Sequence, residues 1–247
     1  MTTLHEKTGV VIMAAGKGTR MKSDLPKALC PLGEKPLVMW VVEAARTLAP
    51  ELTVAVVGHQ REMVKERLAG EGIIFATQEP QLGTGHALAC AAEAFRDFKG
   101  VVLVLSADVP AIKPATLRSL LAARRESKAA VALLTCRMEK PGAYGRVIRS
   151  GGQAQAIVEA RDATEEQLAI QEINAGIYAF DAEFVFGALG KIGRTNAQGE
   201  YYLTDIVAMA VAEGRQVAAV MIDDPAQIRG VNTVEELAAL ERAMLGR

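Results

Sequence analysis

The residues with the clearest chemical potential lie in a short segment near the N-terminus. Residues 14–21 read AAGKGTRM and are followed by a Pro-Lys pair at Pro26 and Lys27. Two glycines let backbone N–H groups approach an anion closely, and basic residues surround them: Lys17, Arg20, Lys22 and Lys27. This combination predicts a polyphosphate site. The spacing excludes a Walker A loop and a dinucleotide fingerprint, and a glycine turn with solvated charges is the alternative interpretation.

A second candidate is Asp108, which follows the apolar run 101–105 and precedes Pro110. A carboxylate at the end of a buried strand suits Mg²⁺, which keeps several waters and takes one or two carboxylates together with phosphate oxygens. An aspartate that caps a turn before proline explains the residue equally well. The residue by itself therefore leaves a metal ligand and a turn residue open.

The segment 78–87 is rich in amides and glycine. It reads QEPQLGTGHA and follows the apolar run 73–76. By itself it predicts a loop and a helix start with Thr84 as the cap. His86, in the first turn of that helix, is interpreted as a structural hydrogen-bonding residue rather than a catalyst.

These segments need a scaffold that brings them together. Short apolar runs recur along the first half of the chain, at 10–13, 52–57, 73–76, 101–105 and 129–135. They are nearly continuous rather than alternating, as strands covered on both faces must be. Helical patterns lie between them, at 36–48, 60–69, 85–98 and 114–126. The alternation predicts an α/β fold: a Rossmann-like, mostly parallel sheet with helices on both faces.

The rhythm changes after about residue 137. Shorter segments and a Gly-Gly turn at 151–152 predict a small antiparallel lobe rather than a separate domain, with the segments at 146–149, 154–159, 173–180 and 217–222. Further helices are expected at 181–191, 203–213 and 233–245. In an open parallel sheet, ligands bind at the carboxyl ends of the strands, which is where the candidate residues above lie.

Composition sets broad limits on function. The chain of 247 residues has 28 Lys plus Arg against 29 Asp plus Glu and only 4% aromatic residues, which argues against a nucleic acid or an acidic membrane as partner. Its three cysteines, Cys30, Cys90 and Cys136, are too far apart for CxxC spacing and fit a reducing compartment. We find no secretory pattern and no run near the ~20 apolar residues that span a bilayer, and expect a cytoplasmic protein.

Several motifs, in order along the chain, resemble those of sugar-1-phosphate nucleotidylyltransferases. They are the segment 14–21 with its Pro-Lys pair, QEPQLGTGHA at 78–87, ADVP at 107–110, YGR at 144–146, VE at 158–159, EIN at 172–174, NAQGEYYLTD at 196–205 and GVN at 230–232. Over about residues 9–245 they look most like the uridylyltransferase domain of the bacterial N-acetylglucosamine-1-phosphate enzyme. No hexapeptide β-helix repeat is found, so we expect no acetyltransferase activity.

The resemblance implies a role for each candidate residue. Arg20 and Lys27 would be the catalytic cations, and Asp108 and Asn232 would hold Mg²⁺, with an N-cap beside Thr233 as the alternative for Asn232. The implied nucleotide-binding residues are Ala14, Ala15, Gly16, Gly18, Gln78, Gln81, Gly83 and Thr84. The implied sugar contacts are Gly145, Glu159 and Asn174. A side-chain amide with both donor and acceptor, beside a glycine backbone group, can read the edge of uracil.

The implied partners are UTP and a sugar-1-phosphate, and the implied reaction transfers UMP to N-acetylglucosamine-1-phosphate to make UDP-N-acetylglucosamine, a cell-wall precursor. The family pattern divides a single domain into a nucleotide-binding part over about 1–137, a sugar-binding lobe with returning strands over about 138–232 and a C-terminal helix over 233–247. Four residues depart from it: Ala175 replaces a usual threonine, Ala160 a histidine, and Ser106-Ala107 a Tyr-Gly pair. Another hexose-1-phosphate, with UTP or dTTP, or a non-catalytic sugar-nucleotide-binding regulator, is the alternative.

Overall fold

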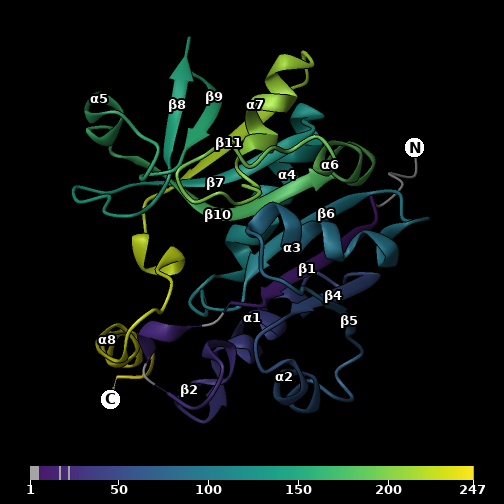
Figure 1. Ribbon diagram of the computed structural model, residues 1–247, viewed down its shortest axis with the longest axis vertical. Helices are drawn as coiled ribbons and strands as arrows, with labels where there is room; N and C mark the ends of the chain where they lie inside the picture. Colours follow the sequence, from purple (N-terminus) through teal and green to yellow (C-terminus); the bar gives the residue numbers. More distant parts are fainter. Residues whose placement is uncertain (1–5, 17, 22, 247) are drawn as a thin grey trace.

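The computed structural model describes residues 6–16, 18–21 and 23–246. A large mixed sheet runs through its centre (Figure 1), in the order β11-β7-β10-β6-β1-β4-β5. The bounds of these strands are β1 Thr8–Ala14, β4 Leu52–Val57, β5 Ile74–Thr77, β6 Val101–Ser106, β7 Val131–Arg137, β10 Glu172–Asp181 and β11 Val217–Ile222. Within this path β10 runs antiparallel to its neighbours β6 and β7, and the other pairings are parallel.

Successive residues of a strand point to opposite faces, and both faces of this sheet are apolar. Val10 and Ile12 of β1 belong to one buried cluster, whereas Val11 belongs to the other. The near-continuous apolar runs of the sequence are therefore explained by burial on two sides. The predicted α/β class, with a mostly parallel sheet and helices on both faces, is confirmed.

Helices cover the two faces as separate layers. The first layer packs on the face of Val10 and consists of α1 Leu37–Arg46, α2 Arg61–Arg67 and α4 Pro114–Ser127. The second packs on the face of Val11 and consists of α3 Thr84–Cys90, α6 Ala182–Leu189 and α7 Asp205–Ala212. The pattern at 85–98 predicts one helix, but α3 ends at Cys90 and a 3-10 turn, η3 Ala92–Phe95, follows. Phe95 still packs into the second layer.

The antiparallel lobe contains fewer strands than the four segments predicted for it after residue 137. It is a hairpin of β8 Arg146–Ser150 and β9 Gln153–Val158, followed by the short helix α5 Glu165–Leu168. The hairpin pairs in register with the main sheet at one position, Ile173 of β10 with Arg146 of β8. The later strands β10 and β11 return to the central sheet. In β10 the register shifts between Asn174 and Tyr178, where Gly176 has a φ of +71°.

The C-terminal helix, α8 Val234–Leu245, lies beside the segment between β1 and α1 (Figure 1). Its Leu240 joins a small apolar cluster with residues around the short strands β2 Pro31–Leu32 and β3 Lys35–Pro36. Short 3-10 turns complete this region, η1 Thr19–Met21, η2 Lys27–Leu29 and η4 Pro225–Ile228. This docking brings the segment before α8 next to the loop after β1. Within the described ranges, every helix is too short or too polar to span a bilayer.

Candidate active site

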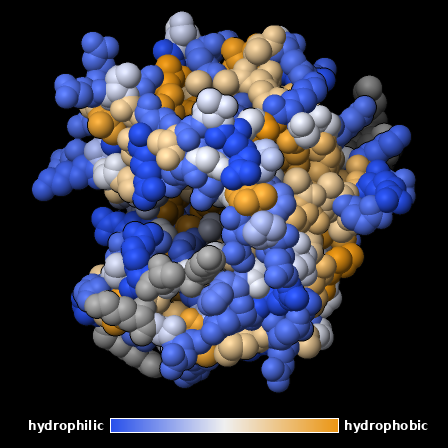
Figure 2. Space-filling view, viewed as in Figure 1, coloured by the Kyte–Doolittle hydropathy of each residue, from blue (hydrophilic) through white to orange (hydrophobic). Residues whose placement is uncertain are grey.

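A cavity of about 450 Å³ lies at the carboxyl ends of β1 and β6. It is lined by predicted nucleotide-binding residues from two separate loops, Ala14, Ala15, Gly16, Gln78, Gln81, Gly83 and Thr84. Lys27, Ser106 and Asp108 lie on its wall as well. The surface is also visibly hollowed between the β8–β9 lobe and the part that carries α8 (Figure 2). The tertiary structure thus brings the glycine loop and the amide-rich loop to one cleft. This is the expected place for a ligand site, because the carboxyl ends of parallel strands meet at one edge of the sheet.

Gly18 is the predicted nucleotide-binding residue that does not line this cavity. Its φ is +59°, and a Cβ there would stand 2.6 Å from the Cβ of Lys27. Glycine at this position therefore allows the loop to turn and to pack against Lys27. Lys17 and Lys22, which contribute to the basic character of the segment, lie outside the described residues.

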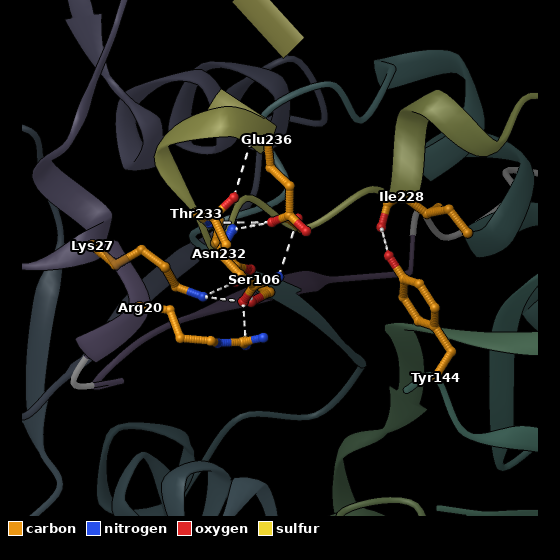
Figure 3. A network of polar contacts seen from close by, with 10 residues as sticks. Arg20, Lys27, Ser106, Tyr144, Ile228, Asn232, Thr233 and Glu236 are labelled. Carbon is orange, nitrogen blue, oxygen red and sulfur yellow. Dashed lines mark hydrogen bonds and ion pairs between the residues drawn. The ribbon is translucent and has the colours of Figure 1, made fainter. Parts of the chain in front are cut away.

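Four polar side chains from distant parts of the chain meet at the edge of the cleft (Figure 3). Lys27 forms an ion pair with Asp108 and also donates to Asn232 Oδ1 at 3.1 Å. Arg20 Nη2 donates to the same oxygen at 2.9 Å. Arg20 and Asn232 are 212 residues apart in sequence, so only the docking of α8 brings them together. The predicted catalytic cations and the predicted metal ligands form one cluster.

This donor set suits a hard divalent cation. One ammonium group, Lys27 Nζ, contacts oxygens of both Asp108 and Asn232, so a single cation can reach both side chains. Among the described residues no group of three or more His, Cys, Asp or Glu is placed to hold a metal. A carboxylate and an amide oxygen fit Mg²⁺, whose remaining positions are commonly filled by water and substrate phosphate.

Two local features hold these oxygens in place. Ser106 Oγ donates to Asp108 Oδ1 at 2.5 Å, and the Asp108 side chain is only 16% exposed. The N-cap of α8 is Thr233, which forms a reciprocal capping box with Glu236. Asn232 therefore does not cap the helix, and its amide is directed to Arg20 and Lys27 instead.

The amide-rich loop is held tightly against the segment 200–203. Gly83 has a φ of +108°, and a Cβ there would stand 2.6 Å from the Tyr201 carbonyl oxygen. Gly83 itself is the residue before α3, which has no side-chain cap. The interpretation of Thr84 as the helix cap is therefore wrong, since Thr84 is the first residue of the helix itself. Its hydroxyl instead accepts a hydrogen bond from Leu203 N at 3.1 Å. The close backbone contact at Gly83 explains why a residue without a side chain is required.

Gln78 is 3% exposed, although it borders the cleft. Its Nε2 donates to Gly83 O at 2.9 Å and lies 3.2 Å from His86 Nδ1. The sequence predicts an amide that offers a ligand both a donor and an acceptor. The structure differs, because the donor end is already engaged inside the protein.

The three predicted sugar contacts lie together beside the β8–β9 lobe. Asn174 N donates to Gly145 O at 2.9 Å, and a Cβ at Gly145 would stand 3.6 Å from Glu159 Oε2. The Asn174 side chain is buried, donating to Tyr178 Oη at 2.6 Å and accepting from Gly176 N at 3.2 Å. These bonds hold the irregular stretch of β10 and leave one amide hydrogen of Asn174 for a ligand.

Glu159 lies in an acidic environment. Burial raises the pKa of its carboxyl, a hydrogen bond from Thr204 acts in the opposite direction, and nearby carboxylates raise it further: Asp162, Asp205 and Glu200. Thr204 Oγ1 donates to Glu159 Oε1 at 3.3 Å. Glu200 also lines the nucleotide cleft, so it stands between the two halves of the site. Sequence reasoning singled out neither Thr204 nor Glu200, although both belong to the polar stretch 196–205.

Comparisons with known proteins agree with this geometry. Residues 10–175 match the model of the MobA-like NTP transferase domain. The chain is 47% identical to the bifunctional protein GlmU of Syntrophotalea carbinolica over 98% of its length and 51% identical to that of Geobacter metallireducens over 94%. It spans about half the length of these curated relatives, 52% and 49%.

The fold also matches a solved structure, described as a putative glucose-1-phosphate thymidylyltransferase from Bacillus anthracis in complex with a sucrose. The TM-score is 0.74 over 96% of this chain and 94% of that one, at 17% sequence identity. At that identity the likeness concerns the fold. The family model covers two thirds of the chain and includes both loops of the cleft. The protein is thus a nucleotidyltransferase that belongs to the MobA-like NTP transferase family.

Proposed function

We propose that this domain transfers UMP from UTP to N-acetylglucosamine-1-phosphate, with Mg²⁺, and releases pyrophosphate. The observation that carries the proposal is the convergence of the amide-rich loop and a cationic cluster on one cleft. Gln78 and Gly83 line the same cavity as Lys27 and Asp108. A triphosphate with its base at one end and its charge at the other matches both features. The similarity to GlmU proteins supports the sugar phosphate as acceptor.

In this reaction a phosphate oxygen of the sugar-1-phosphate attacks the α-phosphorus of UTP, and pyrophosphate leaves in line. The protein contributes mainly by positioning two anions and stabilising the charge of the transition state. Arg20 and Lys27 would stabilise the negative charge that develops on the leaving pyrophosphate. Lys27 now pairs with Asp108, and would turn to the phosphates when the substrates bind.

Asp108 and Asn232 would hold the metal, which supplies positive charge that screens the repulsion between the two phosphates. Ser106 keeps the Asp108 carboxylate oriented through a 2.5 Å hydrogen bond. The resemblance predicts tyrosine at position 106, so this contact is a feature of the present chain. A sugar-nucleotide-binding regulator would not require Arg20 and Lys27 beside the metal ligands, which favours the enzyme.

The sugar would lie near Gly145, Glu159 and Asn174, where carboxylate and amide groups can bind hydroxyl and acetamido groups. Ala175, in place of the usual threonine, is buried at 7% exposure beside Asn174. A hydroxyl is therefore missing next to a predicted sugar contact. This departure favours one second candidate, transfer to another hexose-1-phosphate such as glucose-1-phosphate, with UTP or dTTP.

The test is pyrophosphate release across a matrix of nucleoside triphosphates and sugar-1-phosphates in the presence of Mg²⁺. We expect the highest kcat/KM with UTP and N-acetylglucosamine-1-phosphate. A preference for dTTP or CTP of more than about tenfold, or for glucose-1-phosphate over its N-acetylamino analogue, would contradict the proposed substrates. Turnover of no pair at all would favour the regulator.

A further inference from the structure

The orientation of the Gln78 amide can be assigned from its neighbours. A carbonyl oxygen only accepts hydrogen bonds, so the group that faces Gly83 O at 2.9 Å must be the NH₂ of the amide. The opposite orientation would place two oxygens in contact. The second hydrogen of this NH₂ points to His86 Nδ1 at 3.2 Å. Both donors of Gln78 are therefore engaged within the protein.

This assignment decides the state of His86. Because Nδ1 accepts from Gln78, it carries no proton, and in the neutral ring the proton is on Nε2. The sulfur of Cys90 lies 3.8 Å from Nε2 and can accept a weak hydrogen bond from its N–H group. In this series of hydrogen bonds, which links Gly83, Gln78, His86 and Cys90, every donor therefore faces an acceptor. The backbone also holds His86 in the first turn of α3, since Gly85 N donates to Tyr201 O at 2.8 Å.

Two polar groups of the loop then remain for a ligand. Among the described residues, neither Gln78 Oε1 nor the Gly83 N–H takes part in a hydrogen bond. An acceptor beside a donor is complementary to N3–H and a neighbouring carbonyl of uracil or thymine. Cytosine has a bare nitrogen at N3, so in the same position it would set its lone pair against Gln78 Oε1.

We propose that His86 is a positioning residue that contributes to base selectivity by holding the Gln78 amide, together with Gly83 O, in this orientation. The inference rests on the proposed uridylyl transfer and deepens it. His86 has no contact with the reacting phosphates in this scheme. Its role is to keep the acceptor end of Gln78 toward the base, which discriminates against cytosine but not between uracil and thymine.

The experiment compares kcat/KM for UTP and for CTP in wild type and two His86 variants. His86→Phe keeps a ring but has no acceptor, and we expect the UTP-to-CTP ratio to fall by about tenfold, the scale of one buried hydrogen bond. His86→Asn carries an oxygen on the same carbon that bears Nδ1, and should keep the ratio within about threefold of wild type. The kcat at saturating UTP should change by less than about twofold in both.

Two further arms separate positioning from a general structural effect. In a Gln78→Ala background, His86→Phe should lower the ratio no further, because both changes remove the same contact. The matched control is His59→Phe, at an exposed histidine, which should leave the ratio unchanged. Nitrogen-15 NMR of nucleotide-free protein, with the His86 signals identified by their loss in His86→Phe, should show the proton of the neutral ring on Nε2.

The outcomes distinguish this inference from the proposed function. Wild-type protein that uses UTP and CTP equally would overturn the uridylyl assignment and this inference with it. A wild-type preference for UTP that survives in a folded His86→Phe variant would overturn the inference alone. A proton on Nδ1 would do the same, since Gln78 could then no longer donate to that nitrogen.

Discussion

The two ends of the site, which we propose bind the phosphates and the sugar and call the phosphate end and the sugar end, balance charge in different ways. At the phosphate end Lys27 pairs with Asp108, and Arg20 and Lys27 both donate to Asn232. At the sugar end Glu159 is joined by the neutral hydroxyl of Thr204, and the nearby carboxylates add negative charge. The first arrangement offers cations and metal ligands to an anion. The second offers acceptors to neutral hydroxyl groups, and this division fits the two halves of a sugar phosphate.

The largest expected effect comes from removing the carboxylate of the phosphate end. Asp108→Ala should lower kcat by about 10³-fold, because the variant lacks the proposed carboxylate ligand of the Mg²⁺ that would stabilise the charge of the transition state. Asp108→Asn keeps the shape and loses the charge, so it should also raise the Mg²⁺ concentration needed for half-maximal rate. Turnover is measured against Mg²⁺ concentration for each variant. Near wild-type turnover at limiting Mg²⁺ in variants that unfold normally would make Asp108 a structural residue.

At the sugar end, Glu159→Gln should affect the acceptor rather than the nucleotide. We expect the KM for the sugar-1-phosphate to rise about tenfold and the KM for UTP to stay within about twofold, because one charged acceptor is replaced by a neutral amide. Initial rates with each substrate varied in turn provide the measurement. The exposed Glu139 offers the matched control, Glu139→Gln, which should behave as wild type. Equal changes in both KM values would remove the distinction between the two ends.

The two ends also contain the same helix-capping motif, which allows a matched comparison. Thr164 with Gln167 begins α5 near the lobe, and Thr233 with Glu236 begins α8 beside Asn232. Either threonine replaced by alanine should lower the free energy of unfolding by about 1 kcal/mol. Only Thr233→Ala should also change the Mg²⁺ dependence of turnover, since it loosens the segment that positions Asn232. Chemical denaturation and Mg²⁺ titration of both variants check this, and identical Mg²⁺ curves would count against it.

The smallest expected effect is a pH dependence of stability at the sugar end. Burial raises the pKa of Glu159 above the usual value of 4.5, so the folded protein binds this proton more tightly than the unfolded chain does. The tighter binding of this proton adds to the free energy of unfolding. That contribution is fully present below about pH 4.5 and is lost as the pH rises through the pKa of Glu159 in the folded protein. Glu159→Gln should therefore gain stability relative to wild type as pH rises across this window. A constant difference between the two denaturation midpoints would show that the carboxyl does not titrate this way.

Much of the fold could be predicted because local pattern and burial agree. The run at 52–57 coincides with β4 and the run at 101–105 with all but the last residue of β6, since a continuous apolar sequence suits a strand covered on both faces. The place of β10 could not be predicted. Its antiparallel insertion between β6 and β7 depends on packing among strands that are distant in the sequence, and a strand carries no local signal for its neighbours.

The candidate site likewise has features that could be predicted from the sequence and features that depend on the tertiary structure. Its glycines, its basic residues and the carboxylate after β6 are features of the amino-acid sequence, because backbone freedom and side-chain chemistry are local properties. Their position next to one another is not a local property, because Lys27 contacts Asp108, 81 residues away in sequence, and Asn232, 205 residues away. The sequence also suggested Thr84 as a cap, and the family resemblance implied that Gln78 offers both a donor and an acceptor to the base. Tertiary structure decided otherwise, because hydrogen-bonding partners such as Leu203 N and Gly83 O are chosen by the packing of whole loops.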